Sequence, residues 1–145
     1  MLKRIVLAMT LMLCAASFTV EAAPWGSKRT TATKTKIDQS SKQALMKTFI
    51  QALFINQDYD AIWQLFSPEL KKEMIKEVGS EKAAKEAFTK EIKKGMAEMD
   101  KDELAMVKGA VSTPEGMNAM IKEMLKDGEK DLKKIGNKWY IVNLD

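Results

Sequence analysis

Residues 44–68 read ALMKTFIQALFINQDYDAIWQLFSP, and this stretch predicts two packed helices joined by a tight turn. The apolar residues of the first helix recur every four positions in two neighbouring rows, which are Leu45, Phe49 and Leu53, and Met46, Ile50 and Phe54. A face this broad is typical of a helix that is covered on two sides. Ser40 and Gln43 have the spacing of a capping box, so we expect the helix to begin near Ser41.

The second helix of this hairpin is expected between Tyr59 and Phe66. It follows a turn at residues 56–58, where Asp58 can accept hydrogen bonds from the first free N–H groups of the helix. Ser67 and Pro68 then end it and start another helix, because proline is tolerated at the first helical position. The stretch therefore predicts a helical hairpin around which the rest of the chain packs.

Three more helices are predicted downstream from caps and periodicity. One runs from Pro68 to Val78 and ends at Gly79, with inward residues Leu70, Met74, Ile75 and Val78. Another runs from Glu81 to Lys94 behind the cap Ser80, with inward residues Ala84, Ala87, Phe88 and Ile92. The last begins at Thr113-Pro114 and presents a stripe formed by Met117, Met120, Ile121, Met124 and Leu125.

The middle and the end of the chain use different patterns. Residues 96–112 suit either a short strand or a helix, and we favour a helix. Leu132–Ile135 and Trp139–Val142 are typical of two strands joined by the two-residue turn Gly136-Asn137. The sequence therefore predicts one helix-rich α+β domain over residues 40–145, with the helical hairpin packed on a C-terminal antiparallel β-hairpin or small curved sheet.

The N-terminus is typical of a secretory signal peptide. Lys3 and Arg4 precede an apolar run, and small residues follow it, which favours cleavage after Ala22. We therefore expect an exported protein, periplasmic or secreted; the alternative is a signal that is retained as a membrane anchor. Residues 23–39 are rich in Thr, Lys and Ser, which predicts a disordered basic linker that either acts as a spacer or contacts an anionic envelope surface loosely.

The residue types that are absent restrict the chemistry of the expected mature chain. The whole sequence has no histidine, and its one cysteine, Cys14, lies in the predicted signal peptide. Catalysis by Ser-His-Asp or Cys-His groups is therefore excluded, together with ordinary zinc sites. The sequence also has no glycine-rich phosphate loop, and its excess positive charge lies largely in the linker, so nucleic acid is not an expected partner.

Apolar side chains are the best candidates for a binding site. Aromatic residues of the helical hairpin and the last strand suit an apolar pocket, and clustered methionines suit an adaptable surface for an apolar ligand or a peptide. The simpler interpretation is that all of them form the core, and Cu(I) bound by thioethers is a further alternative. The candidate ligand-binding residues are Phe49, Trp63, Phe66, Met117, Met120, Met124 and Trp139.

Two segments resemble a known superfamily. ALFINQDYDAIWQLFSPELKK (residues 52–72) and GNKWYIVNLD (residues 136–145) are similar to the opening helices and the last strand of bacterial envelope domains in the nuclear transport factor two-like superfamily. The resemblance implies a cone of helices on a curved sheet, with a pocket between them, in a superfamily of both enzymes and binding modules. Residues 80–128 depart from it, because they predict helices where long strands are expected; the fold is then either a sheet with masked strands or a mostly helical relative with one hairpin.

We therefore expect an exported domain that acts by binding and without a cofactor. Its expected partner is an apolar small molecule or an envelope protein. Two alternatives remain: a module for protein–protein contacts, which predicts an exposed apolar patch, and an enzyme with a carboxylate or tyrosine as acid or base, which predicts a buried group of shifted pKa facing a pocket.

Overall fold

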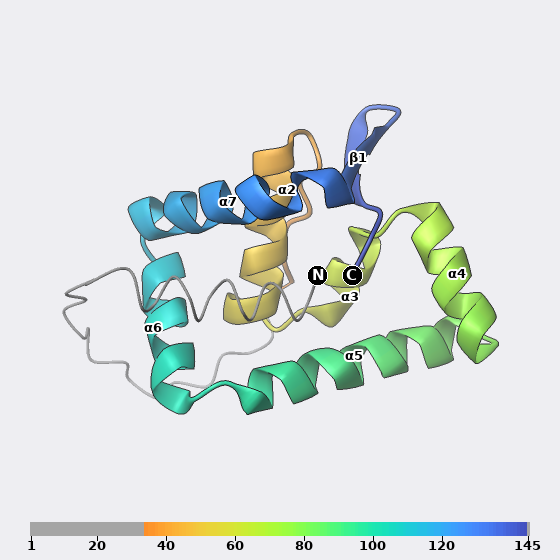
Figure 1. Ribbon diagram of the computed structural model, residues 1–145, viewed down its shortest axis with the longest axis horizontal. Helices are drawn as coiled ribbons and strands as arrows, with labels where there is room; N and C mark the ends of the chain where they lie inside the picture. The colour runs from red at the N-terminus through yellow and green to blue at the C-terminus, as the bar shows by residue number, and fades with distance from the viewer. Residues whose placement is uncertain (1–33, 145) are drawn as a thin grey trace.

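The computed structural model describes residues 34–144, which form six α-helices, a π-helix, a short 3-10 helix and a two-stranded antiparallel sheet (Figure 1). The predicted helix-rich α+β fold is therefore confirmed. The predicted signal peptide, residues 1–22, and the first part of the predicted linker, residues 23–33, lie outside the described residues.

The predicted helical hairpin lies at the centre of the fold. Helix α2 (Lys42–Ile50) continues directly into the π-helix η1 (Gln51–Ile55), and α3 (Tyr59–Gln64) follows the turn. Both apolar rows of the first arm are buried, with every side chain at most 4% exposed. These rows are Leu45, Phe49 and Leu53, and Met46, Ile50 and Phe54.

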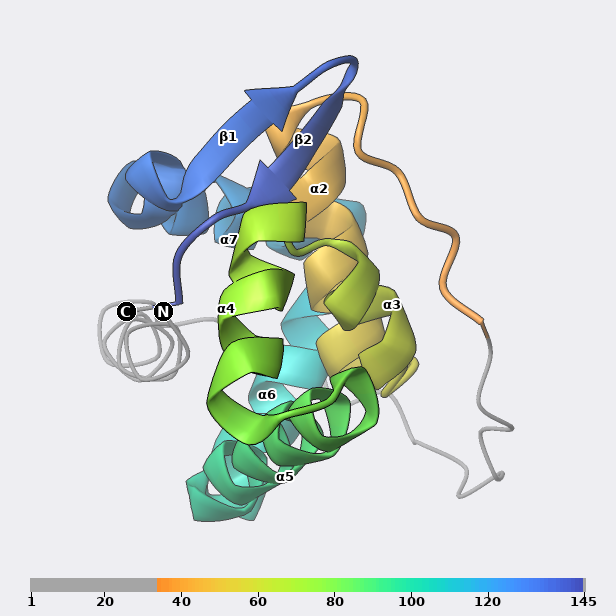
Figure 2. The ribbon, with the colours of Figure 1, turned by 90° about the vertical axis from the view of Figure 1, so that its right-hand side faces the viewer.

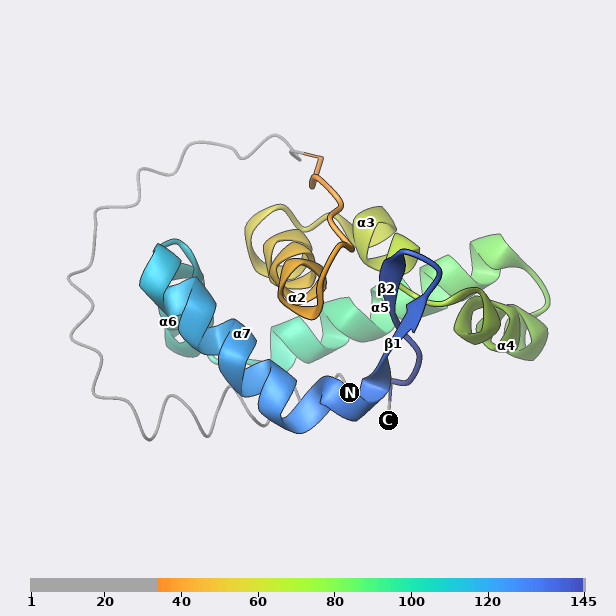
Figure 3. The same cartoon turned by 90° about the horizontal axis from the view of Figure 1, so that it is seen from above.

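The other four helices surround this centre. They are α4 (Pro68–Val78), α5 (Glu81–Glu98), α6 (Lys101–Val111) and α7 (Pro114–Gly128). In Figure 1 they form the four sides of a frame, with α2 and α3 inside it, and the view from above shows α5 passing behind α2 from the α4 side to the α6 side (Figure 3). A frame of this kind explains why the first arm needs a broad apolar face.

The last turn of the first arm is a π-helix, which the sequence did not predict. The N–H of Asn56 donates to the Gln51 carbonyl at 2.8 Å, and the N–H of Asp58 donates to the Ala52 carbonyl at 2.8 Å. Three consecutive residues of η1 are buried, Ala52, Leu53 and Phe54, whereas Ile55 is 40% exposed. The wider π turn therefore buries more successive residues than one face of a regular α-helix offers.

Side-chain caps set most of the helix starts, as predicted. A side-chain oxygen of Asp58, Ser67, Ser80 or Thr113 accepts from the N–H group three residues later, at 3.1 to 3.2 Å. The first helix is capped one residue later than the capping-box spacing suggests, because Ser41 accepts from Ala44 N–H at 3.0 Å. The hydroxyl of Ser40 instead donates to the Asp38 carboxylate at 2.7 Å.

Two predicted inward residues face the solvent. Val78 at the end of α4 is 44% exposed, and Ala87 of α5 is also exposed. Helix α5 continues beyond Lys94 to Glu98, so Gly95, where the sequence left the end of the helix open, lies inside it. Val78 is the last residue of α4. On α5 the buried residues Ala84, Phe88 and Ile92 form a single row at four-residue spacing, and Ala87 lies outside that row.

The C-terminal hairpin forms as predicted. After the 3-10 helix η2 (Glu129–Asp131), strand β1 (Leu132–Ile135) pairs with β2 (Lys138–Ile141), and Leu132 lies opposite Ile141. Gly136 in the two-residue turn has φ +63°, a conformation that glycine adopts without strain. The sheet that residues 34–144 form has these two strands, so the mostly helical alternative with one hairpin describes the fold, and residues 96–112 are helical as we favoured.

The last part of the predicted linker is held against the domain, so that prediction is wrong for residues 34–39. Thr35 and Gln39 are buried, and Ile37 packs against the core. The N–H of Thr35 donates to the Asp58 carboxylate at 2.9 Å, and the Asn56 amide donates to the Thr35 hydroxyl at 2.8 Å. Composition failed here because hydrogen bonds, together with the single apolar residue Ile37, are enough to order this polar segment.

Candidate functional site

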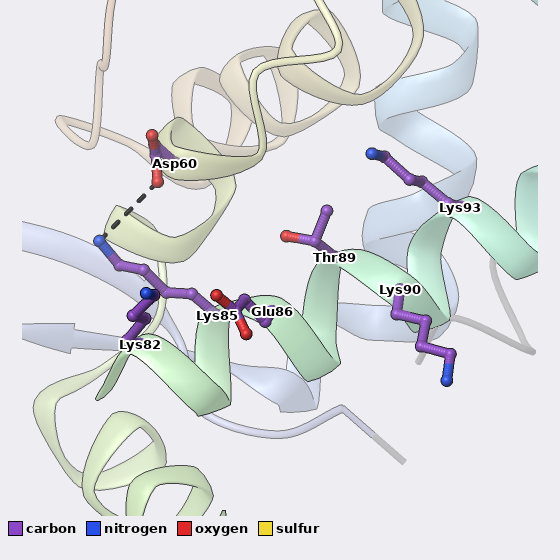
Figure 4. A pocket seen from close by; sticks show the side chains of 7 residues that line it. All are labelled: Asp60, Lys82, Lys85, Glu86, Thr89, Lys90 and Lys93. Carbon is purple, nitrogen blue, oxygen red and sulfur yellow. Dashed lines mark ion pairs between the residues drawn. The ribbon is translucent and has the colours of Figure 1, made fainter. Parts of the chain in front are cut away.

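An open groove of about 570 Å³ lies between α5 and the start of α3 (Figure 4). Six of its lining residues occupy one face of α5, and the seventh comes from the first turn of α3. Positions on α5 recur at spacings of three and one, so the helix presents them as a continuous stripe about 16 Å long. The lining residues are Asp60, Lys82, Lys85, Glu86, Thr89, Lys90 and Lys93.

The groove has an excess of positive charge, since four lysines and two carboxylates line it. Lys85 Nζ lies 3.8 Å from Asp60 Oδ1, and Figure 4 shows the two side chains turned toward each other. Because both groups are exposed, such a pair contributes at most about 1 kcal/mol. Lys93 is placed over the ring of Tyr59, with Nζ 5.5 Å from the ring centroid. Burial of that ring raises the pKa of Tyr59 above its ordinary value.

The groove was not predicted from the sequence. Its lysines alternate with other charged residues along the chain, and such a run usually forms a solvated face. The spacing of Lys82, Lys85, Lys90 and Lys93 on one helical face was the available signal. The opposite wall depends on Asp60, whose position beside α5 follows only from the tertiary packing.

The three aromatic candidates of the helical hairpin are part of the core. Phe49, Trp63 and Phe66 are each at most 2% exposed. Trp63 and Phe66 form a cluster with Phe88, in which the ring centroids of Phe66 and Phe88 are 4.8 Å apart in an edge-to-face arrangement. The indole N–H of Trp63 donates to Glu81 Oε1 at 3.3 Å. Phe88 completes this cluster. Its spacing in the sequence predicted only that it faces inward from its helix.

The remaining candidates occupy two other parts of the core. Met117 and Met120 on α7 are buried, and Met124 is half-buried beside them. Trp139 on β2 is half-buried, and Lys42 Nζ lies 5.0 Å from the centroid of its ring. All seven predicted ligand-binding residues thus belong to the core cluster or pack against it, and none of them lines the groove.

Asp58 at the start of α3 has a structural role, as the cap pattern predicted. Asp58 uses both carboxylate oxygens, Oδ1 for Ala61 N–H at 3.1 Å and Oδ2 for Thr35 N–H at 2.9 Å. Asp60 pairs with Lys85 in the groove. Within residues 34–144, no group of three or more His, Cys, Asp or Glu side chains is arranged to hold a metal ion.

Two further observations concern membrane-spanning helices and similarity to known proteins. None of the helices between residues 34 and 144 is both long enough and apolar enough to cross a membrane. No known protein family, characterised protein or solved structure matches this chain. Its function is therefore inferred from its own sequence and geometry.

Proposed function

We propose that this protein is an exported, non-catalytic module that binds a partner protein in the bacterial envelope through its surface. The observation that supports this most directly is the groove along α5, which is open, about 570 Å³ in volume and lined by charged side chains. A mixed lining with an excess of lysine suits a protein surface that has an excess of acidic residues. Export is inferred from the N-terminal charge, apolar run and small residues.

The burial of the apolar candidates favours surface binding over an enclosed apolar ligand. Phe49, Trp63 and Phe66 are packed as a core, and a ligand among them would have to separate Phe66 and Phe88, whose ring centroids are 4.8 Å apart. Opening an edge-to-face pair forfeits about 1 kcal/mol beyond the loss of buried area. An exposed groove requires no such rearrangement.

Site-specific photo-crosslinking in the native host tests the proposal. A photoreactive residue at Thr89, inside the groove, should give a crosslinked protein of discrete mass. The double variant Lys82→Glu and Lys90→Glu should reduce that product at least about tenfold, since reversed charges oppose an acidic partner. Both lysines are exposed and make no ion pair within residues 34–144, so the fold should tolerate the change.

The matched control is the double variant Lys72→Glu and Lys76→Glu on α4, which changes the charge equally at two exposed lysines outside the groove. Equal loss of the product in both variants would contradict a specific role for the groove. Native mass spectrometry of the protein from its host supplies the second measurement. Two results together would favour the apolar-ligand alternative over the proposal. Denaturation would release a small molecule of defined mass, and the groove variant would give the same amount of crosslinked product as the wild type.

A further inference from the structure

The two strands of the hairpin differ in how their outer edges are covered. β2 lies on the side of α2, and β1 is the outer strand (Figure 2). The outward backbone groups of β2 are bonded: Trp139 N–H donates to Gln39 at 2.8 Å, Ile141 N–H donates to Leu65 at 2.9 Å, and Ser67 N–H donates to Ile141 at 2.9 Å. Both edges of β2 therefore have hydrogen-bond partners, as in a strand inside a larger sheet.

In the part of the chain that the structure describes, β1 has outward backbone groups without partners. Val142 N–H donates to the Asp131 carbonyl at 2.8 Å, so by the alternation of the antiparallel ladder Leu132 and Lys134 direct their backbone groups away from β2. Leu132 N–H donates to Glu129 and closes η2. The Leu132 carbonyl and both backbone groups of Lys134 have no hydrogen-bond partner among residues 34–144. Such an edge is a template for another strand.

The outer face of the hairpin also has apolar side chains that lie outside the core formed by residues 34–144. Leu132 and Ile141 lie on the inner face and are buried in the core. On the opposite face, Ile135 and Tyr140 are half-buried and do not belong to the core cluster or to the residues packed against it. A strand added to β1 would supply alternate side chains to extend this face.

The charge of the hairpin indicates what kind of strand fits. Its exposed charged residues are Lys133, Lys134 and Lys138, and exposed Lys130 lies just before it in η2. The two acidic residues of η2 already have partners, because Asp131 is buried with its carboxylate bonded to Asn143 and Glu129 pairs with Lys42. Pairing of β1 with β1 of a second copy would bring like charges together, which destabilises a sheet.

We propose that β1 accepts an extended acidic segment of a partner protein as a third strand. The backbone groups of Leu132 and Lys134 supply the hydrogen bonds, and the lysines select acidic side chains. The inference rests on the proposed binding function but uses a different surface, since the hairpin and α5 lie at opposite ends of the molecule (Figures 1 and 2). A result that contradicts binding at β1 therefore does not contradict binding at the groove, and the reverse also holds.

A designed peptide tests the edge directly. The probe is an eight-residue peptide in which glutamate alternates with valine or threonine, and amide hydrogen exchange is followed by NMR on the unmodified protein. Binding should slow exchange of the Lys134 amide at least about tenfold, because that N–H becomes a ladder donor. The same peptide with alternate backbone amides N-methylated keeps its charge but cannot complete the ladder, and it should give no such protection.

Charge variants provide a second, separate readout. Lys133→Glu with Lys134→Glu should weaken binding of the peptide at least about tenfold, whereas the groove variant Lys82→Glu with Lys90→Glu should bind it normally. Circular dichroism checks that both variants are folded. Equal binding of the N-methylated peptide, unchanged exchange at Lys134, or dimerisation of the protein through β1 would each overturn the inference.

Discussion

Gln39 and Trp139 bond to each other in both directions although they are 100 positions apart in the chain. The N–H of Trp139 donates to the Gln39 carbonyl at 2.8 Å, and the side-chain amide of Gln39 donates to the Trp139 carbonyl at 2.8 Å. The pairing fastens the segment before α2 to the second strand of the hairpin. It joins the two ends of the described chain across one edge of the sheet.

Replacing Gln39 should therefore lower the stability of the whole domain. Gln39→Ala removes the bond to the Trp139 carbonyl, and we expect the free energy of unfolding to fall by about 1 kcal/mol. Urea denaturation followed by circular dichroism measures the change. Gln43→Ala removes an exposed glutamine from α2 and should have little effect. Equal stability of the Gln39 variant and the wild type would contradict a stabilising role for this pairing.

Asp58 holds two segments through its two carboxylate oxygens, and substitution should separate the two roles. Asp58→Asn has one side-chain oxygen, so it can keep the cap on Ala61 or the bond to Thr35, but not both. We expect a loss of about 1 kcal/mol for Asp58→Asn and about 2 kcal/mol for Asp58→Ala. Urea denaturation measures both, and the exchange rate of the Thr35 amide reports which bond remains. Asp60→Asn, at an exposed ion pair, should cost less than either.

Gly116 and Gly128 both lie in α7 but should respond oppositely to alanine. A Cβ at Gly116 would lie 2.0 Å from the Ala110 carbonyl oxygen, a backbone atom that can move only if α6 moves. We expect Gly116→Ala to cost about 3 kcal/mol or more. A Cβ at Gly128 would meet no atom of another residue packed against it within 4 Å, and φ is negative, so Gly128→Ala should be neutral or slightly stabilising. Thermal unfolding of the two variants gives the comparison.

Tyr59 should make the fold sensitive to alkaline pH. Burial raises the pKa of Tyr59 above its ordinary value of 10.0, because the ionised phenolate is less favourable away from water. A raised folded-state pKa contributes stability below the unfolded value, and this stability is lost as the pH rises through the folded value. Tyr59→Phe should therefore flatten the decline of stability above about pH 10. Urea denaturation from pH 8 to 11 tests this, and an unchanged alkaline decline would contradict it.

Export should be visible in the mass of the protein isolated from its host. Cleavage after Ala22 predicts a chain that begins at Ala23, since the small residues after the apolar run satisfy the cleavage rule. Intact-mass measurement on the envelope fraction identifies the first residue. A mass that includes Met1 to Ala22 would instead favour the retained anchor, and a protein found only in the cytoplasm would contradict export.

Much of the secondary structure was predictable because its signals are local. Ser67-Pro68, Ser80 and Thr113-Pro114 each begin a helix through a bond to a residue only three positions away. The turn at Gly136 likewise depends on the conformation of one residue. The π turn at Gln51–Ile55 was missed because an i to i+5 bond leaves no distinct pattern of residue types.

The candidate site was less predictable because it depends on contacts between distant elements. The apolar residues chosen as ligand-binding candidates satisfy the same pattern as core residues, and the structure places them in or against the core. The groove requires Asp60 to face α5, and the open edge of β1 requires Gln39 and Leu65 to cover β2. None of these relationships leaves a local signal.

By itself, the sequence determined the class of the fold, most helix starts, the β-hairpin and the exclusion of histidine-based chemistry, since each depends on residue type or on neighbours within a few positions. Only the tertiary structure decided which apolar residues are covered, that residues 34–39 pack on the domain, and where the charged groove and the free strand edge lie. The physical reason is that burial and long-range hydrogen bonds depend on which elements meet in space.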